Sequence, residues 1–325
     1  MDRKISTETI IAGVRQGDKR CASLLMSLIE DGSREGEACL RNLYPPFGRS
    51  YVLGITGWPG VGKSTLINRM ARSFLAEDKQ VGVIAIDPTS PFSGGSLLGD
   101  RERMKEIDGD FRLFIRSSAT RGQTGGMTPT TRAFIKILEA MGKEVILLET
   151  VGIGQNEVSV AQVADTIVLI VIPGMGDYLQ TLKAGVLEIG DIFVVNKSDR
   201  EGANQTVADL QMFIDLNSGQ SEWKPPIIKT IASDRKGIEE LMAAIHRHRE
   251  YLTKGNLIQS KRESAAKSEI LEIMKSRFIG QVAEQTPLDK RLNAYAQQIC
   301  DGSMDPYRAA EEILKDSGII KKKKA

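Results

Sequence analysis

The chain has few of the residues that build metal clusters or disulfide frameworks. It contains two histidines and three cysteines, Cys21, Cys39 and Cys300, with no C-x-x-C pair. This scarcity argues against a structural zinc site and against disulfides, and it is typical of a protein of the reducing cytosol. His246 and His248 stand two apart in an expected helix, so they point to different faces and do not form a metal-binding pair.

The sequence also lacks a long apolar segment and a broad excess of positive charge. No run of about 18 apolar residues is present, and the first residues are charged, which argues against a membrane span and a signal peptide. The net charge is +2, but Lys321–Lys324 supply four positive charges, so the rest of the chain is slightly negative. We therefore expect a cytoplasmic protein that binds neither nucleic acid nor membrane.

Short β-branched runs that alternate with helical patterns are abundant. The 325 residues, 41% of them apolar, can bury a large core. Between residues 49 and 253 the alternation predicts an α/β fold, with a mostly parallel sheet covered by helices on both faces. The predicted strands are Tyr51–Thr56, Val81–Ile86, Arg112–Ile115, Glu144–Glu149, Thr166–Ile172, Asp191–Val195 and Ile227–Thr230.

Helical patterns without strands flank this core, so we predict three regions, 1–48, 49–253 and 254–325. In the last region we expect Thr286 and Asp305 to cap helices that begin with a proline. This region has few large apolar residues for its length, so we expect it to pack on another surface, as a dimerisation arm. The predicted flanking helices are Thr7–Arg15, Lys19–Glu30, Gly36–Leu43, Ser264–Glu284, Pro287–Ile299 and Pro306–Lys315.

The segment Gly57–Ser64 has the sequence G-W-P-G-V-G-K-S, a complete phosphate-binding loop. It follows a predicted strand and precedes a helical pattern, the context that this motif requires. Backbone N–H groups and the helix N-terminus then favour a polyphosphate. Lys63 is expected to reach the β- and γ-phosphates, and Ser64 to bind Mg²⁺. The predicted nucleotide-binding residues of this loop are Pro59, Gly60, Val61, Gly62, Lys63, Ser64 and Thr65.

A second motif, Asn196-Lys197-Ser198-Asp199, follows another predicted strand. An aspartate here can accept hydrogen bonds from N1–H and the exocyclic amine of guanine, and adenine offers neither donor on that edge. Asn196, Lys197 and Asp199 therefore favour GTP over ATP; the alternative is an Asx turn that closes the strand. Ala232 and Ser233 follow the next strand, where a loop backbone could touch the guanine.

Carboxylates follow two other predicted strands. Glu149 closes one strand and Asp87 another, and Asp100 lies in a glycine-rich loop. With Ser64 they form the predicted Mg²⁺ site, although capping and turn formation could also account for these aspartates. The N–H of Gly152 is expected to bond the γ-phosphate.

Together these segments resemble a known family. They are G-W-P-G-V-G-K-S-T, I-D-P-T-S-P-F-S-G-G-S-L-L-G-D-R-E-R-M, E-T-V-G-I-G-Q-N-E, P-G-M-G-D-Y-L-Q-T-L-K-A-G and N-K-S-D. They are similar to the G proteins associated with methylmalonyl-CoA mutase, of the MeaB or ArgK type. The resemblance implies a homodimeric P-loop GTPase with helical additions. It also implies that GTP hydrolysis serves to protect and reload an adenosylcobalamin-dependent acyl-CoA mutase.

The resemblance implies a partner-sensing switch over Gly174–Lys183, which moves Lys183 towards the nucleotide. Ile153 stands where Ras-like enzymes keep a water-orienting glutamine, so we expect slow intrinsic hydrolysis. Gln155 could replace that group if the loop reshapes, and the candidate catalytic residues are thus Lys63, Lys183 and Gln155. Tyr178 stands where the family usually has an acidic residue, which leaves open whether the partner acts on methylmalonyl-, isobutyryl-, ethylmalonyl- or hydroxyisobutyryl-CoA.

The sequence disfavours two other classes of function. A metallochaperone GTPase needs a Cys/His cluster to carry its ion, and the scattered cysteines disfavour it. A kinase of the arginine/ornithine transport type would bind a nucleotide similarly, but the guanine motif and the absence of an obvious base for an acceptor argue against it.

Overall fold

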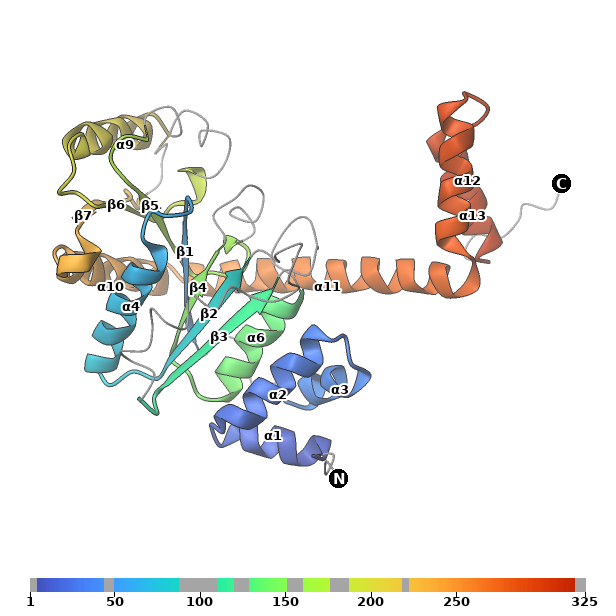
Figure 1. Cartoon of the computed structure of the whole chain (residues 1–325), viewed down its shortest axis with the longest axis horizontal. Helices are drawn as coiled ribbons and strands as arrows, with labels where there is room; N and C mark the ends of the chain where they lie inside the picture. Colours follow the sequence, from blue (N-terminus) through green and yellow to red (C-terminus); the bar gives the residue numbers. More distant parts are fainter. Residues whose placement is uncertain are drawn as a thin grey trace. The chain divides into compact units, whose positions relative to one another are not determined.

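A sheet of seven parallel strands forms the core of residues 50–262 (Figure 1). The strand order is β3-β2-β4-β1-β5-β6-β7, and every neighbouring pair runs parallel. This confirms the predicted α/β class. The strands are β1 (Tyr51–Gly57), β2 (Val81–Asp87), β3 (Leu113–Ala119), β4 (Val145–Glu149), β5 (Thr166–Val171), β6 (Ile192–Asn196) and β7 (Ile227–Thr230).

This computed structural model describes residues 5–43, 50–87, 110–119, 129–150, 160–175, 187–217 and 222–318, without the side chains of Asp87 and Ala119. Two compact units, Met1–Arg262 and Glu263–Ala325, make up the chain. Within the described ranges, no helix is both long and apolar enough to cross a membrane. The helices are α1 (Thr7–Arg15), α2 (Lys19–Glu30), α3 (Arg34–Leu43), α4 (Lys63–Ala76), α6 (Pro129–Ala140), η1 (Leu187–Ile189), α9 (Ala203–Asn217), η2 (Ala232–Asp234), α10 (Ile238–Lys254), α11 (Leu257–Gln285), α12 (Leu288–Cys300) and α13 (Pro306–Asp316).

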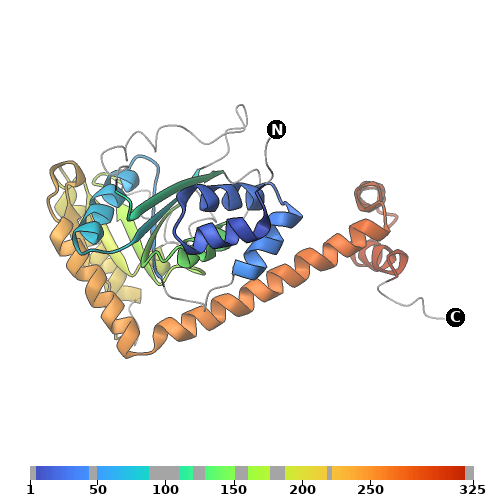
Figure 2. The same cartoon turned by 90° about the horizontal axis from the view of Figure 1, so that it is seen from below.

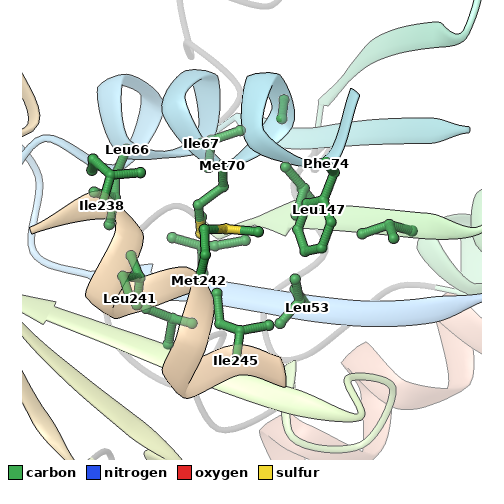
Figure 3. Packing of buried hydrophobic residues seen from close by; sticks show 14 of the residues in the cluster. Leu53, Leu66, Ile67, Met70, Phe74, Leu147, Ile238, Leu241, Met242 and Ile245 are labelled. Atoms are coloured by element: carbon green, nitrogen blue, oxygen red, sulfur yellow. The ribbon is translucent and has the colours of Figure 1, made fainter. Parts of the chain in front are cut away.

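Alternate residues of the strands point to opposite faces of the sheet and pack in a hydrophobic layer on each face. In β1, Tyr51, Leu53 and Ile55 pack with helices α4 and α10, and Val52, between Tyr51 and Leu53, belongs to the opposite layer, with α6. Figure 3 shows Met70 and Phe74 of α4 packed against Met242 of α10 above the strands. Burying such a side chain contributes about 1.5–3 kcal/mol, so the two layers fix the strands between the helices. The strand ends that carry the site are thereby held in place.

Helices α1, α2 and α3 pack on α6, so the N-terminal segment is part of the first compact unit (Figure 1). Their buried side chains, such as Leu25 and Met26, belong to the same hydrophobic cluster as Phe134 of α6 and Ile84 of β2. The three-region division of the sequence stays a prediction.

Charged and polar groups join the start of α11 to the amino ends of the strands. α10 and α11 meet at a bend at Gly255–Asn256 (Figure 2). Just beyond the bend, Lys261 Nζ donates to the Asp165 carbonyl at 3.0 Å, and Arg262 pairs with the Asp165 carboxylate at 3.1 Å. The Asp165 carboxylate also accepts from the Val52 N–H at 2.8 Å. The first turns of α11 are therefore bound to the sheet edge opposite the ends of the strands where ligands collect.

A buried ionisable pair lies beside these contacts. His248 Nδ1 is 2.7 Å from Thr166 Oγ1, and its Nε2 is 3.5 Å from Asp191 Oδ1. Asp191 Oδ2 accepts from the Ile167 N–H at 2.8 Å. Burial raises the pKa of Asp191 to about 6, and burial together with Lys261 lowers the pKa of His248 to about 3. Above pH 6 the folded protein therefore holds a largely buried carboxylate against a neutral imidazole.

We predict that Asp191 makes folding stability fall as the pH rises from about 4 to 7. Because its pKa in the folded protein is raised, its favourable contribution is complete below the unfolded value of 3.8 and is lost as the pH passes about 6. Denaturant unfolding should show the stability of the wild type relative to Asp191→Asn falling by about 2 kcal/mol over this range. Asp209→Asn, at an exposed position of α9, is the control. A constant difference between the wild type and Asp191→Asn at all pH values would contradict the prediction.

Three details of the predicted secondary structure were wrong. Strand β3 was predicted as Arg112–Ile115 but runs on to Ala119, because Arg116 pairs with Glu30 of α2 and so tolerates its place in the strand. Helix α11 begins at Leu257, not at residue 264. Thr286 does not cap α12: its hydroxyl donates back to Val282, and the cap position is Pro287. Asp305 caps α13 as predicted, accepting from Tyr307 and Arg308.

Candidate functional site

The predicted site residues lie where the parallel strands end. Gly57 ends β1, Glu149 ends β4, Asn196 ends β6 and Thr230 ends β7. Because all these strands are parallel, their carboxyl ends meet at one edge of the sheet, where open α/β sheets bind ligands. The order of the strands thus joins segments that are up to 173 residues apart, from Gly57 to Thr230.

The phosphate-binding loop turns tightly from β1 into α4. Gly62 has φ +100°, and a Cβ there would lie 2.5 Å from Asn196 Nδ2, so only glycine fits. Helix α4 begins at the next residue, and its first N–H groups therefore point into the loop. Lys63 is 7% exposed, and its ammonium donates to the carbonyls of Gly57 at 2.9 Å and Trp58 at 3.3 Å. The loop thus gathers N–H donors and a cation around one concave backbone segment.

Ser64 and Glu149 meet behind this loop. Ser64 Oγ donates to Glu149 Oε1 at 3.0 Å, and both residues are buried. The neighbouring strand β2 runs beside β4 with Ala85 opposite Glu149, so the main chain of Asp87 ends at the same edge. A hydroxyl and a carboxylate are hard oxygen donors and fit Mg²⁺, which keeps several water and phosphate ligands. No group of three or more His, Cys, Asp or Glu that could hold a metal ion lies in the described ranges.

Asn196 connects three loops at this edge. Its Nδ2 donates to the Val61 carbonyl at 2.7 Å, and its Oδ1 accepts from Thr230 Oγ1 at 3.0 Å and from the Ala232 N–H at 3.1 Å. Lys197, next along the chain, donates to the Gly60 carbonyl at 2.8 Å. The first two residues of the guanine motif therefore bind the phosphate loop and the loop after β7.

Asp199 lies in the turn that follows β6, and its side chain is exposed. The Ser198 N–H donates to the Thr230 carbonyl at 3.1 Å, and the Arg200 N–H donates to the Lys197 carbonyl at 3.0 Å. Both bonds hold the backbone on either side of Asp199, and its exposed side chain is accessible just beyond the end of β6.

The predicted residues of four segments meet at this edge, and other predicted residues lie outside the described part of the chain. Asp100, Gly152, Gln155 and Lys183 fall outside the described residues, as does the side chain of Asp87. The predicted residues at the described site edge are Pro59, Gly60, Val61, Gly62, Lys63, Ser64, Thr65, Glu149, Asn196, Lys197, Asp199, Ala232 and Ser233.

Sequence reasoning missed two residues of this edge. Thr230 was assigned only to a strand, but its hydroxyl donates to Asn196. Arg69, on α4, donates to the carbonyls of Ala232 and Ser233. Neither belongs to a motif, and both contacts join segments far apart in the chain, so no local pattern could reveal them.

Comparisons with known proteins agree with this geometry. The family model for the methylmalonyl-CoA mutase-associated GTPase MeaB matches residues 21–287. A protein of Pyrococcus abyssi whose name describes it as a GTPase is 43% identical over 312 residues, 95% of this chain and 96% of that protein. A mouse protein named methylmalonic aciduria type A homolog, mitochondrial, is 32% identical over 311 residues, 94% of this chain and 74% of its own.

A solved structure has the same fold. The crystal structure of LAO/AO transport system kinase matches with a TM-score of 0.71 and covers 97% of this chain and 98% of its own, at 22% sequence identity. At this identity the likeness bears on the fold, and it agrees with the predicted P-loop architecture with helical additions.

Proposed function

Because this chain belongs to the MeaB family of methylmalonyl-CoA mutase-associated GTPases, we propose that it is a chaperone for an adenosylcobalamin-dependent acyl-CoA mutase. As a member of this family it is a GTPase that binds GTP and GDP. In the proposed role, GTP hydrolysis gates the loading of the mutase cofactor and protects the loaded enzyme. The observation that carries the proposal is the family match over residues 21–287, which runs from α2 to the end of α11.

We propose that the strand-end edge is the GTP site. Lys63 would hold the β- and γ-phosphates, and Asp199 would select guanine, with Asn196 and Lys197 fixing the loops around it. Ser64 and Glu149 would hold a Mg²⁺ ion, with Asp87 and Asp100 as further candidates. Such an ion neutralises phosphate charge during transfer. The contacts between Asn196 and Val61 and between Ser64 and Glu149 support this assignment.

We further propose that the protein is a homodimer and that α11 forms its contact. Of the 29 residues of this helix, Val282 alone is buried. Its exposed large apolar side chains are 36–60% accessible, and they are Leu257, Ile270, Leu271, Ile273, Met274, Phe278 and Ile279. So many apolar groups on one helix favour coverage by another surface. Sedimentation that finds a monomer at micromolar concentration would contradict the dimer.

The chaperone role is tested by mixing the purified protein with each of the four acyl-CoA mutases named above. We expect one of these mutases to raise the rate of GTP hydrolysis at least tenfold. The same mutase should lose its own activity more slowly during turnover when this protein and GTP are present. The Lys63→Ala variant is the control and should do neither. If no mutase changes the hydrolysis rate, the proposal is wrong. Labelled γ-phosphate on an acceptor, rather than as free phosphate, would favour a kinase instead.

For the stimulated reaction we predict that Lys183 supplies charge to the transferred phosphoryl group. Lys183→Ala should lose up to ~10³-fold of the mutase-stimulated hydrolysis rate, because a cation at the developing phosphate charge stabilises the transition state. The unstimulated rate should stay unchanged, and Lys183→Arg should keep much of the stimulation. Single-turnover hydrolysis with and without the mutase measures both rates. A wild-type stimulated rate in Lys183→Ala would exclude this role.

A further inference from the structure

Arg69 of helix α4 lies against the loop that follows β7. Its Nε donates to the Ala232 carbonyl at 3.0 Å, and its Nη2 donates to the Ser233 carbonyl at 3.2 Å. The planar guanidinium thus bonds two successive carbonyls of η2 with charge-assisted hydrogen bonds. A lysine could donate to both oxygens only by bending a flexible chain, so the contact depends on the shape of arginine as well as on its charge.

The same loop is held from its other side. The Ala232 N–H donates to Asn196 Oδ1, and Asn196 Nδ2 donates to Val61 of the phosphate loop. Because Val61 leads directly into α4, the contacts close a ring: from Arg69 to Ala232, to Asn196, to Val61 and back along α4. The ring passes through both the loop expected to face phosphate and the loop expected to face guanine.

The backbone of this loop is costly to hold in its observed form. Arg235 has φ +61° and Gly237 has φ +75°, and a Cβ at Gly237 would lie 2.1 Å from the Lys229 carbonyl. Ile231 and Lys236 exchange N–H···O bonds across the turn at 3.1 and 3.3 Å. A non-glycine residue at positive φ is uncommon and persists where the surrounding contacts hold it. Arg69 provides two such contacts from outside the loop.

We infer that Arg69 is a positioning residue for guanine recognition, which holds the Ala232–Ser233 loop in its binding conformation and in register with the phosphate loop. It acts through the loop and does not touch the nucleotide. The inference rests on the proposed GTP site and adds a residue that lies in neither motif. Without Arg69 the loop orders only when the base binds, so the base contributes less to affinity while the phosphates bind as before.

The test compares a ligand that has a base with one that has none. Calorimetry at fixed Mg²⁺ and about 150 mM salt, which screens remote charge, measures binding of GDP and of inorganic tripolyphosphate. For Arg69→Ala we expect GDP to bind about tenfold more weakly and to dissociate faster, with tripolyphosphate unchanged. Arg69→Lys should fall between this variant and the wild type.

Arg72→Ala is the matched control, since Arg72 lies on the same helix and its Nε donates to Asn68 at 3.1 Å, within α4. It should bind both ligands like the wild type. Retained tripolyphosphate binding also shows that Arg69→Ala is folded. Unchanged GDP affinity in Arg69→Ala, or an equal loss for GDP and tripolyphosphate, would overturn the inference. These measurements need no mutase, so their outcome does not depend on the outcome of the chaperone test.

Discussion

An Asp199→Asn variant should bind GTP at least about 100-fold more weakly and should prefer xanthosine triphosphate. In the proposed site the Asp199 carboxylate accepts from N1–H and the amine of guanine. An asparagine amide keeps one acceptor and turns a donor towards the other guanine donor, so one hydrogen bond is lost and two donors oppose each other. Xanthine has a carbonyl oxygen in place of the amine, and the amide can donate to it. Sites that read a base through buried polar groups discriminate by such factors.

Calorimetric titration of the wild type and Asp199→Asn with guanosine, xanthosine and adenosine nucleotides measures this change. Asp209→Asn on α9 is the matched control, because Asp209 accepts from Gln205 on the same exposed helix surface. The control should keep the wild-type preference for GTP. If the wild type binds ATP as tightly as GTP, or if Asp199→Asn keeps its GTP affinity, then Asp199 does not read the purine and the exposed carboxylate only closes a turn.

A Lys63→Ala variant should hydrolyse GTP about 10³-fold more slowly than the wild type. Lys63 is held in the loop by the carbonyls of Gly57 and Trp58, so little side-chain freedom remains to be lost when its ammonium moves to a phosphate. The developing negative charge of the transition state then loses a cation that is already in place. Lys63→Arg should not restore the rate, because the larger guanidinium does not fit the same enclosed position between two carbonyls.

Single-turnover hydrolysis of bound GTP gives this rate without the contribution of nucleotide exchange. Lys79→Ala is the control: Lys79 forms an exposed ion pair with Glu144 at 3.0 Å, well outside the site, and its loss should leave the rate unchanged. A Lys63→Ala rate within a few-fold of the wild type, in protein that still melts cooperatively, would show that this lysine does not serve the reaction.

The sheet could be predicted from the sequence because its strands are buried on both faces. Runs such as Thr166–Val171 and Ile192–Asn196 are continuously buried, and a continuous β-branched run is a strong local signal. The errors lie where burial depends on a distant partner. Arg116 makes the end of β3 look like a loop until its pairing with Glu30 is known. The start of α11 looks like a polar linker until Lys261 and Arg262 are seen to contact Asp165.

At the site, too, residues in local motifs could be predicted and contacts between distant residues could not. Lys63 and Ser64 belong to the phosphate-loop motif and Asn196 to the guanine motif, so the sequence alone predicts them as site residues. Ser64 and Glu149 were predicted to share a Mg²⁺ ion; the structure shows a hydrogen bond between them, and the metal site stays a prediction. The contacts of Arg69 could not be predicted, because they join residues 163 and 164 positions apart and use two carbonyl groups that any residue type would offer.

The position of Arg116 has a consequence for how copies of this protein associate. Among the described strands, β3 is an edge strand of the sheet. An edge strand can serve as a template for pairing with the same strand of another molecule. Arg116 sits in the middle of β3 and directs its charge inwards to Glu30 and Ser27 of α2. An inward charge of this kind opposes extension of the sheet into a fibre. We therefore expect the protein to form no fibrillar aggregates at high protein concentration.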